Sequence, residues 1–156
     1  MNTNKKRVFF NTYWRIVKVA ADKYGIYPEI LMAIMAHETA WGRSDNLLKG
    51  NNPGGITTAK GRKTPYWSPA DGTRPRPESE GGTYNVYKTL ELGLLDNAYL
   101  LTYPRYNSSF KVQNITEEFT KRFVKTGYFT GDPEAYRKSL NFNIPLIKKA
   151  YESVTK

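Results

Sequence analysis

The sequence contains no cysteine and only one histidine, His37. The absence of cysteine excludes a disulfide-stabilised scaffold and a thiol nucleophile, and together with the lone histidine it excludes a zinc site built from Cys and His ligands. A serine–histidine triad would depend wholly on His37. We therefore expect no metal ion and no cofactor, and any catalysis has to use carboxylates or tyrosines.

Long apolar runs are also missing. The longest uncharged apolar stretch, 30–36, is about a third of a bilayer span, so we expect no transmembrane segment. The stretch 8–21 that follows the basic start is interrupted by Asn11, Arg15 and Lys18, and lacks the apolar core of a secretory signal. We expect no Sec signal peptide and synthesis in the cytoplasm.

Positive charge is in excess, with 24 Lys and Arg against 14 Asp and Glu, a formal net charge of +10. Such a surplus favours polyanionic partners such as nucleic acid, anionic lipid or an anionic cell-wall polymer. The aromatic residues do not alternate with Lys and Arg along one strand or helix, as a stacking platform for single-stranded nucleic acid requires. We therefore expect no nucleic-acid partner.

Length and hydrophobic periodicity predict one monomeric domain over 1–156. Helices are predicted at 9–24, 28–40, 90–101, 115–126 and from 133 onward. Asn114 and Glu117 have the spacing of a capping box for the fourth helix, and Asp132 with Pro133 opens the last one. Pro145 is expected to kink or split that last helix.

Between these helices, residues 46–82 hold most of the glycines and prolines and show no helical period. Strands are expected only at 56–58, 66–67 and 83–87. The predicted fold is mainly α, in the α+β class. A helical lobe (8–45 and 88–154) carries an inserted β-lobe (about 46–87), and a cleft separates the two lobes.

Glu38 is the most unusual polar residue of the predicted helices. Leu31, Met35 and Glu38 stand at i, i+4 and i+7, so a carboxylate ends a stripe that otherwise faces the core. Burial among apolar neighbours raises a carboxyl pKa and favours a general acid. In the alternative interpretation, Glu38 reaches water or pairs with Arg43.

Two adjoining segments, Ala36-His37-Glu38-Thr39-Ala40-Trp41-Gly42-Arg43-Ser44 and Asn51-Asn52-Pro53-Gly54-Gly55-Ile56, resemble the signature of peptidoglycan-hydrolysing glucosaminidase domains, glycoside hydrolase family 73. Segments 84–87, 103–106 and 127–136 resemble the later motifs of that family, in the same order. The resemblance covers about 26–147 and implies a lysozyme-like fold. Pro53-Gly54, Phe129 and Gly131 depart from the family pattern.

The resemblance implies roles for individual residues. Glu38 becomes the proton donor, Asn51 and Asn52 shape the cleft floor, and Tyr128 is functional. Glycoside hydrolysis ordinarily uses a second carboxylate, and the β-lobe offers Glu78 or Glu80, with Glu78 slightly preferred and Asp71 a distant third. In the alternative interpretation both glutamates are solvated turn residues. Assistance by the acetamido group of the substrate would reduce the need for either, with Tyr128 orienting that group.

Aromatic rings stack on the apolar faces of sugars. The candidate substrate-binding residues, which include the two asparagines and the last tyrosine of the resemblance, are Trp41, Asn51, Asn52, Tyr66, Trp67, Tyr103, Tyr106 and Tyr136. Trp41 could equally be a core residue and not a substrate-binding one.

The favoured function is bacteriolytic cleavage of the β-1,4 bond between N-acetylglucosamine and N-acetylmuramic acid in the glycan strands of an anionic cell wall. The enzyme would reach the wall after release, as an endolysin does, or as part of a phage or secreted assembly. One alternative is a muramidase or lytic transglycosylase with a lysozyme-like fold. Another is a basic, non-catalytic module that binds glycan or nucleic acid.

Overall fold

A computed structural model describes residues 3–155 of the chain. Its elements in chain order are α1 (Thr3–Lys23), α2 (Pro28–Glu38), α3 (Asp45–Gly50), the 3-10 helix η1 (Pro69–Asp71), β1 (Thr73–Pro75), β2 (Thr83–Asn85), α4 (Leu90–Leu101), α5 (Pro104–Phe110), α6 (Thr116–Val124) and α7 (Pro133–Val154).

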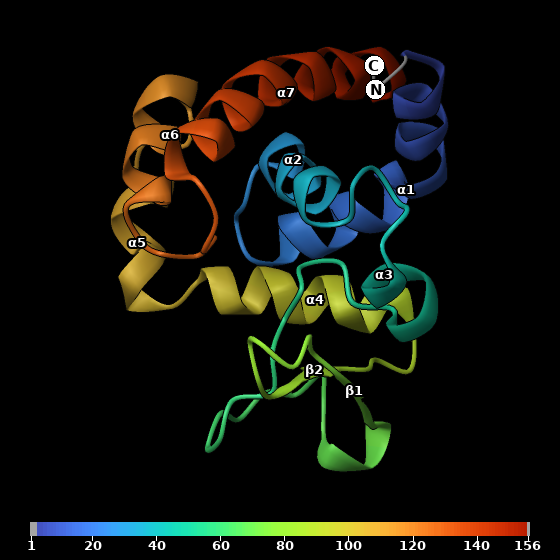
Figure 1. The fold of residues 1–156 in the computed structure, drawn as a ribbon. Coiled ribbons are helices and arrows are strands. Elements are labelled where there is room, and N and C mark those ends of the chain that lie inside the picture. The colour runs from blue at the N-terminus through green and yellow to red at the C-terminus, as the bar shows by residue number, and fades with distance from the viewer. Residues whose placement is uncertain (1–2, 156) are drawn as a thin grey trace.

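Helix α2 lies at the centre of the helical part, with α7 and α4 on opposite sides of it (Figure 1). Its residues from Ile30 to Ala36 are completely buried, and it contacts both α1 and α7. A helix that is apolar on every side needs neighbours on every side, and the uncharged run 30–36 meets that condition. The same run that is too short to span a membrane therefore forms the core.

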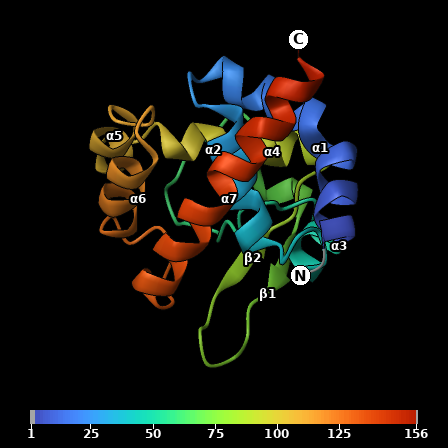
Figure 2. The same cartoon turned by 90° about the horizontal axis from the view of Figure 1, so that it is seen from above.

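The β-lobe is small and lies beyond α4 in Figure 1. Strands β1 and β2 pair antiparallel with Thr73 opposite Asn85, and an isolated bridge joins Thr57 to Tyr84. The loop between β1 and β2 extends away from the helices in Figure 2. The predicted fold class, a mainly helical lysozyme-like α+β fold with a small sheet, is confirmed.

Close packing joins the start of the β-lobe to α4. A Cβ atom added at Gly93 would overlap the carbonyl oxygen of Asn51, and one added at Gly54 would lie 2.8 Å from the side-chain nitrogen of Asn97. A larger side chain at Gly93 would require the Asn51 backbone to shift, and one at Gly54 would require the Asn97 side chain to move. These two glycines let the loop after α3 approach the helix that carries Asn97.

A buried carboxylate fastens the β-lobe to α4 at a second point. Asp96 accepts two hydrogen bonds from the Arg62 guanidinium, at 2.8 and 2.9 Å. The hydroxyl groups of Thr64 and Tyr87 each donate to the same carboxylate at 2.5 Å. The loop at 62–64, the end of the β-lobe at Tyr87 and helix α4 therefore meet at Asp96.

Several predicted helix ends were wrong. Helix α1 begins by Thr3, before the expected start at Phe9, and α2 ends at Glu38 rather than Ala40. The capping box at Asn114 is absent, because the N-cap residue of α6 is Ile115 and has no side-chain hydrogen bond. The Asp132 cap of α7 is present, with its carboxylate accepting from the backbone of Glu134.

Other expectations also failed. Helices α3 and α5 were not predicted. Ser44, whose side chain caps the N-terminus of α3, was a sequence feature that could have indicated that helix. Segment 66–67 forms no strand. Helix α7 runs unbroken through Pro145, so the expected split is wrong. Packing of α7 against α2 and α6 holds the helix together across the proline.

The proposed single domain over 1–156, with lobes at 8–45, 46–87 and 88–154, stays a prediction. Met1, Asn2 and Lys156 of that range lie outside the described residues. No helix of residues 3–155 combines the length and hydropathy needed to cross a bilayer.

Candidate active site

The end of α2 presents the Glu38 side chain. Backbone bonds from Ala40 to His37 and from Trp41 to Ala36 close the helix in a Schellman arrangement. Ala40 and Trp41 take positive φ angles of 49° and 59°, conformations that L-residues adopt rarely. The helix therefore stops abruptly after Glu38, and its last side chain emerges at the edge of the core.

Glu38 lies in a cleft of about 580 Å³ between the helical part and the β-lobe. An added Cβ at Gly55 would be 3.6 Å from Glu38 Oε2, so the carboxyl group faces the start of the β-lobe. The cleft is lined by Glu38, Asn46, Gly54, Gly55, Ile56, Thr57, Ala59, Arg62, Arg76, Glu80, Tyr84, Leu100, Arg105, Tyr106, Gly127, Tyr128, Phe129 and Thr130.

Burial raises the pKa of Glu38 from its ordinary value near 4.5 to about 8. Among residues 3–155 no side chain donates a hydrogen bond to this carboxyl group. Arg43, the alternative partner, instead donates to the carbonyl oxygen of Ala40 at 3.0 Å. Glu38 therefore holds its proton at neutral pH and faces a cleft into which it can donate it.

Two tyrosines of the predicted site lie near Glu38. Tyr128 accepts a hydrogen bond of 2.8 Å from Asn97 Nδ2. Burial, and then the nearby Glu38 charge, raise the pKa of Tyr128 and of Tyr136 well above the usual value. Both phenols stay protonated. The Tyr128 hydroxyl proton is therefore available to an acceptor in the cleft, and the Tyr136 oxygen is buried without a hydrogen-bond partner among residues 3–155.

The two candidates for the second carboxylate are placed differently. Both residues are exposed, but Glu80 lines the cleft, where its carboxylate pairs with Arg76 at 3.4 Å, and Glu78 does not line it. The geometry therefore favours Glu80, and which of the two glutamates acts stays a prediction. Both residues belong to the loop between β1 and β2, where the side chains follow no regular alternation that a sequence pattern can read.

Asn51 and Asn52 hold the backbone of the loop that begins the β-lobe, and their predicted role in shaping the cleft floor stays a prediction. Asn52 is fully buried, donates to the carbonyl oxygens of Ile56 and Asn85, and accepts from the Ile56 backbone. Asn51 ends α3 in a left-handed conformation and donates to the Tyr87 carbonyl. Their side chains are committed to the backbone of the loop and are not among the cleft-lining residues.

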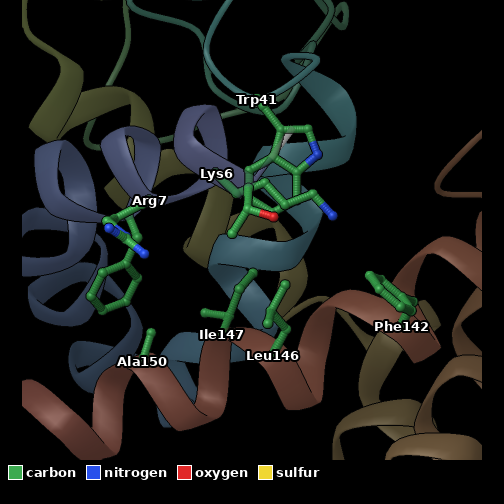
Figure 3. A pocket seen from close by; sticks show the side chains of 9 residues that line it. Lys6, Arg7, Trp41, Phe142, Leu146, Ile147 and Ala150 are labelled. Atoms are coloured by element: carbon green, nitrogen blue, oxygen red, sulfur yellow. The ribbon is translucent and has the colours of Figure 1, made fainter. Parts of the chain in front are cut away.

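Trp41 lies outside the cleft. Its ring packs edge-on against Phe9 at 5.3 Å and under the Lys6 ammonium at 4.9 Å. Figure 3 shows it at a separate pocket of about 410 Å³ that the start of α1 and the second half of α7 complete. The structure places Trp41 in packing, the alternative that the sequence left open.

Of the other aromatic candidates, only Tyr106 lines the cleft. Tyr66 contacts the Tyr24 hydroxyl and the Tyr99 ring, which attaches the β-lobe to the helices. Trp67 donates to the Gly72 carbonyl at 3.3 Å. Tyr103 accepts from Arg62 at 3.2 Å and lines a pocket next to the cleft.

Asn97 and Asp96 were missed from the sequence. Both are completely buried on α4, and Asn97 contacts both Tyr128 and the loop at Gly54. The sequence feature that could have identified them is the presence of two polar residues between Leu94 and Ala98, in a helix predicted to belong to the core. Within residues 3–155 no group of three His, Cys, Asp or Glu residues is arranged to hold a metal ion.

The comparison with protein families decides the identity. The glucosaminidase model, described as mannosyl-glycoprotein endo-beta-N-acetylglucosaminidase, matches residues 14–149. The chain belongs to the glucosaminidase family. It is a glycoside hydrolase, and the resemblance stated from the sequence is confirmed. No curated protein sequence matches this glucosaminidase.

Solved structures share the fold of this glucosaminidase. The glycoside hydrolase domain of FlgJ from Salmonella typhimurium has a TM-score of 0.70 at 22% identity, covering 100% of this chain and 94% of that one. The catalytic domain of the autolysin Auto from Listeria monocytogenes has a TM-score of 0.68 at 22% identity, covering 95% and 87%. A peptidoglycan hydrolase from Sphingomonas sp. A1 has a TM-score of 0.69 at 21% identity, covering 92% and 93%.

Proposed function

We propose that this glucosaminidase hydrolyses peptidoglycan at the β-1,4 bond between N-acetylglucosamine and N-acetylmuramic acid, with Glu38 as general acid. The observation that carries the proposal is the Glu38 carboxyl group, without a hydrogen-bond partner in the described chain and with its pKa raised to about 8 at the edge of the cleft. The substrate class is supported by the peptidoglycan hydrolases that share the fold and by the net charge of +10, which suits an anionic wall.

In the proposed reaction Glu38 donates its proton to the glycosidic oxygen as the bond from that oxygen to the sugar C1 breaks. Positive charge develops on C1 and the ring oxygen. Water then adds to C1, and its proton passes either to the Glu80 carboxylate or, after attack by the acetamido oxygen, back to Glu38. In this proposal Tyr128 donates a hydrogen bond to the acetamido group, and the hydrogen bond that Tyr128 accepts from Asn97 supports that role.

The site of action follows from the substrate. We propose that the protein reaches the cell wall after release from the cytoplasm or within a phage or secreted assembly, and works there as a monomer.

Mass spectrometry of digested wall tests the bond that is cut. Release of reducing N-acetylglucosamine is the expected result. Reducing N-acetylmuramic acid would identify a muramidase, and the anhydro product would identify a lytic transglycosylase. No cleavage at all, with binding retained, would identify a glycan-binding module.

The rate of cleavage is expected to fall as the pH rises through about 8, because only protonated Glu38 can donate and burial raises the pKa of Glu38 to about 8. Below that pH Glu38 is protonated and does not limit the rate. Above it the rate should drop about tenfold per pH unit. Initial rates on soluble glycan fragments between pH 6 and 10 measure this, and a rate that still rises above pH 9 would contradict Glu38 as the acid.

Glu80→Gln is expected to slow cleavage strongly, by about 10²-fold or more, while Glu78→Gln has little effect. The reason is position, since Glu80 lines the cleft and Glu78 does not. The two variants are matched in chemistry and lie in the same loop, so each controls for the other. If Glu80 activates water, azide should restore turnover of Glu80→Gln as a glycosyl azide of inverted configuration. If Glu78→Gln and Glu80→Gln both stay active while Tyr128→Phe is inactive, the result would favour assistance by the acetamido group of the substrate.

A further inference from the structure

A second depression continues the cleft toward α5. It has a volume of about 540 Å³ and shares Ala59, Arg62, Leu100, Arg105 and Tyr106 with the cleft. Lys60, Gly61, Lys63 and Tyr103 complete it. We call this depression the cationic pocket. Because the two cavities have five residues in common, a substrate bound in the cleft can place a substituent in the cationic pocket.

The charge of the cationic pocket is not balanced locally. No acidic residue of the part of the chain that the structure describes lines it. Arg62 is neutralised by Asp96, but Lys60 and Lys63 are exposed and have no ion-pair or hydrogen-bond partner among residues 3–155. Arg105 donates to the Thr126 carbonyl and lies 5.4 Å from the Tyr106 ring centre, without a carboxylate partner in the described chain. Three cations therefore surround this space.

The cleft next to it differs in charge. Apart from Arg62 and Arg105, which both cavities share, its charged residues are Glu38, protonated at neutral pH, and Glu80 paired with Arg76, so this part of the cleft suits a neutral sugar. The pocket wall also has an apolar part, since Leu100 and the ring of Tyr103 line it. The Tyr103 hydroxyl is held by Arg62 at 3.2 Å. A ligand with carboxylates on a short aliphatic framework matches both features.

We propose that the cationic pocket binds the carboxylates of the peptide stem attached to the sugar in the cleft. The proposal rests on the proposed function, because the peptidoglycan substrate supplies that stem. It makes Lys60 and Lys63 specificity residues that favour stem-bearing, acidic glycan over neutral glycan. Arg105 adds a third charge at the boundary between the two cavities.

The experiment compares soluble peptidoglycan fragments with the same fragments after their carboxyl groups are converted to neutral amides. Amidation leaves the glycan and any wall phosphate unchanged, so it separates carboxylate recognition from phosphate recognition. The proteins are the wild type, Lys60→Gln/Lys63→Gln, and Lys148→Gln/Lys149→Gln. The last pair, exposed on α7 and absent from the cleft, removes the same charge. Cleavage at sub-saturating substrate and equilibrium binding are both measured.

Exposed ion pairs each contribute little, so two of them together should change kcat/KM and affinity by about tenfold. For the wild type and Lys148→Gln/Lys149→Gln, kcat/KM and affinity should fall by this factor when the substrate is amidated. For Lys60→Gln/Lys63→Gln, kcat/KM and affinity should already be lower by this factor on the untreated substrate, and amidation should not lower them further.

Equal behaviour of the two double variants would overturn the proposal, as would a preference that survives amidation. The latter result would point to phosphate or neutral contacts. If no protein cleaves either substrate, the proposed function fails. The binding measurement still decides whether Lys60 and Lys63 recognise carboxylates.

Discussion

Replacing Glu38 with glutamine is expected to lower the rate of glycan cleavage by about 10²–10⁴-fold while the protein stays folded. The amide keeps the shape of the side chain but has no proton to donate to a leaving oxygen. Clearance of purified cell walls and release of reducing ends measure the loss. Glu152→Gln, an exposed change of the same chemistry at the end of α7, is the control and should keep full activity.

The same variant should also be more stable than the wild type in alkaline solution. Burial raises the pKa of Glu38 in the folded state to about 8, whereas the unfolded chain loses this proton near 4.5. Between these values the folded state holds a proton that the unfolded state has lost, so wild-type stability falls as the pH rises. Glutamine removes that cost, which we put at about 2–4 kcal/mol above pH 8.

Unfolding in urea at pH 5 and at pH 8.5 measures this gain in stability. The advantage of Glu38→Gln should be small at pH 5 and reach its full size at pH 8.5. A folded variant that clears walls at the wild-type rate would remove Glu38 from the mechanism. An inactive variant without a pH-dependent gain in stability would show instead that Glu38 titrates normally.

Asp96→Asn is expected to cost about 3–5 kcal/mol of the free energy of unfolding, because it leaves the Arg62 charge without its partner. The side chain of Asp96 is 0% exposed and that of Arg62 is 11% exposed, so water cannot replace the lost contact. The hydroxyl groups of Thr64 and Tyr87 also lose a charged acceptor. The attachment of the β-lobe to α4 should loosen, and activity should fall with it.

Asp22→Asn provides the matched comparison. Its partner Lys18 lies one helical turn away, and the two side chains are 38% and 52% exposed, so this change should cost less than about 1 kcal/mol. Removing both charges with Arg62→Met/Asp96→Asn should recover part of the loss, because no unpaired buried cation is left. Equal stability losses for Asp96→Asn and Asp22→Asn would show that the buried pair contributes nothing beyond a surface pair.

Local sequence predicted the elements whose signals are periodic or chemically specific. The apolar run of α2 could only be a central helix, α4 ends where it was predicted to end, and Asp132 with Pro133 opens α7 as expected. Glu38 was singled out because it ends a stripe of core residues. The resemblance to the family motifs then supplied the order of the turns, which periodicity alone does not encode.

Short or aperiodic segments were predicted less well. Helices α3 and α5 have too few turns to show a period. The pair 66–67 has strand-forming residues, but Tyr66 packs with Tyr24 and Tyr99 and Trp67 donates to the Gly72 carbonyl. Proline disfavours a helix interior, but tertiary contacts can offset that cost. Helix α7 continues through Pro145, where it packs against other helices.

Tertiary structure decided everything that depends on which distant segments meet. It brought Glu80 rather than Glu78 into the cleft, because the side-chain direction in an irregular loop follows from the loop's packing and not from residue type. It gave Tyr128 the support of Asn97 and moved Trp41 to a different pocket. Buried polar groups are almost always hydrogen-bonded, and the partner is often distant in sequence. The role of such a residue therefore depends on the tertiary structure and not on the residues beside it in the sequence. Composition and local pattern specify a basic helical domain with a buried acid, and the arrangement around that acid exists only in three dimensions.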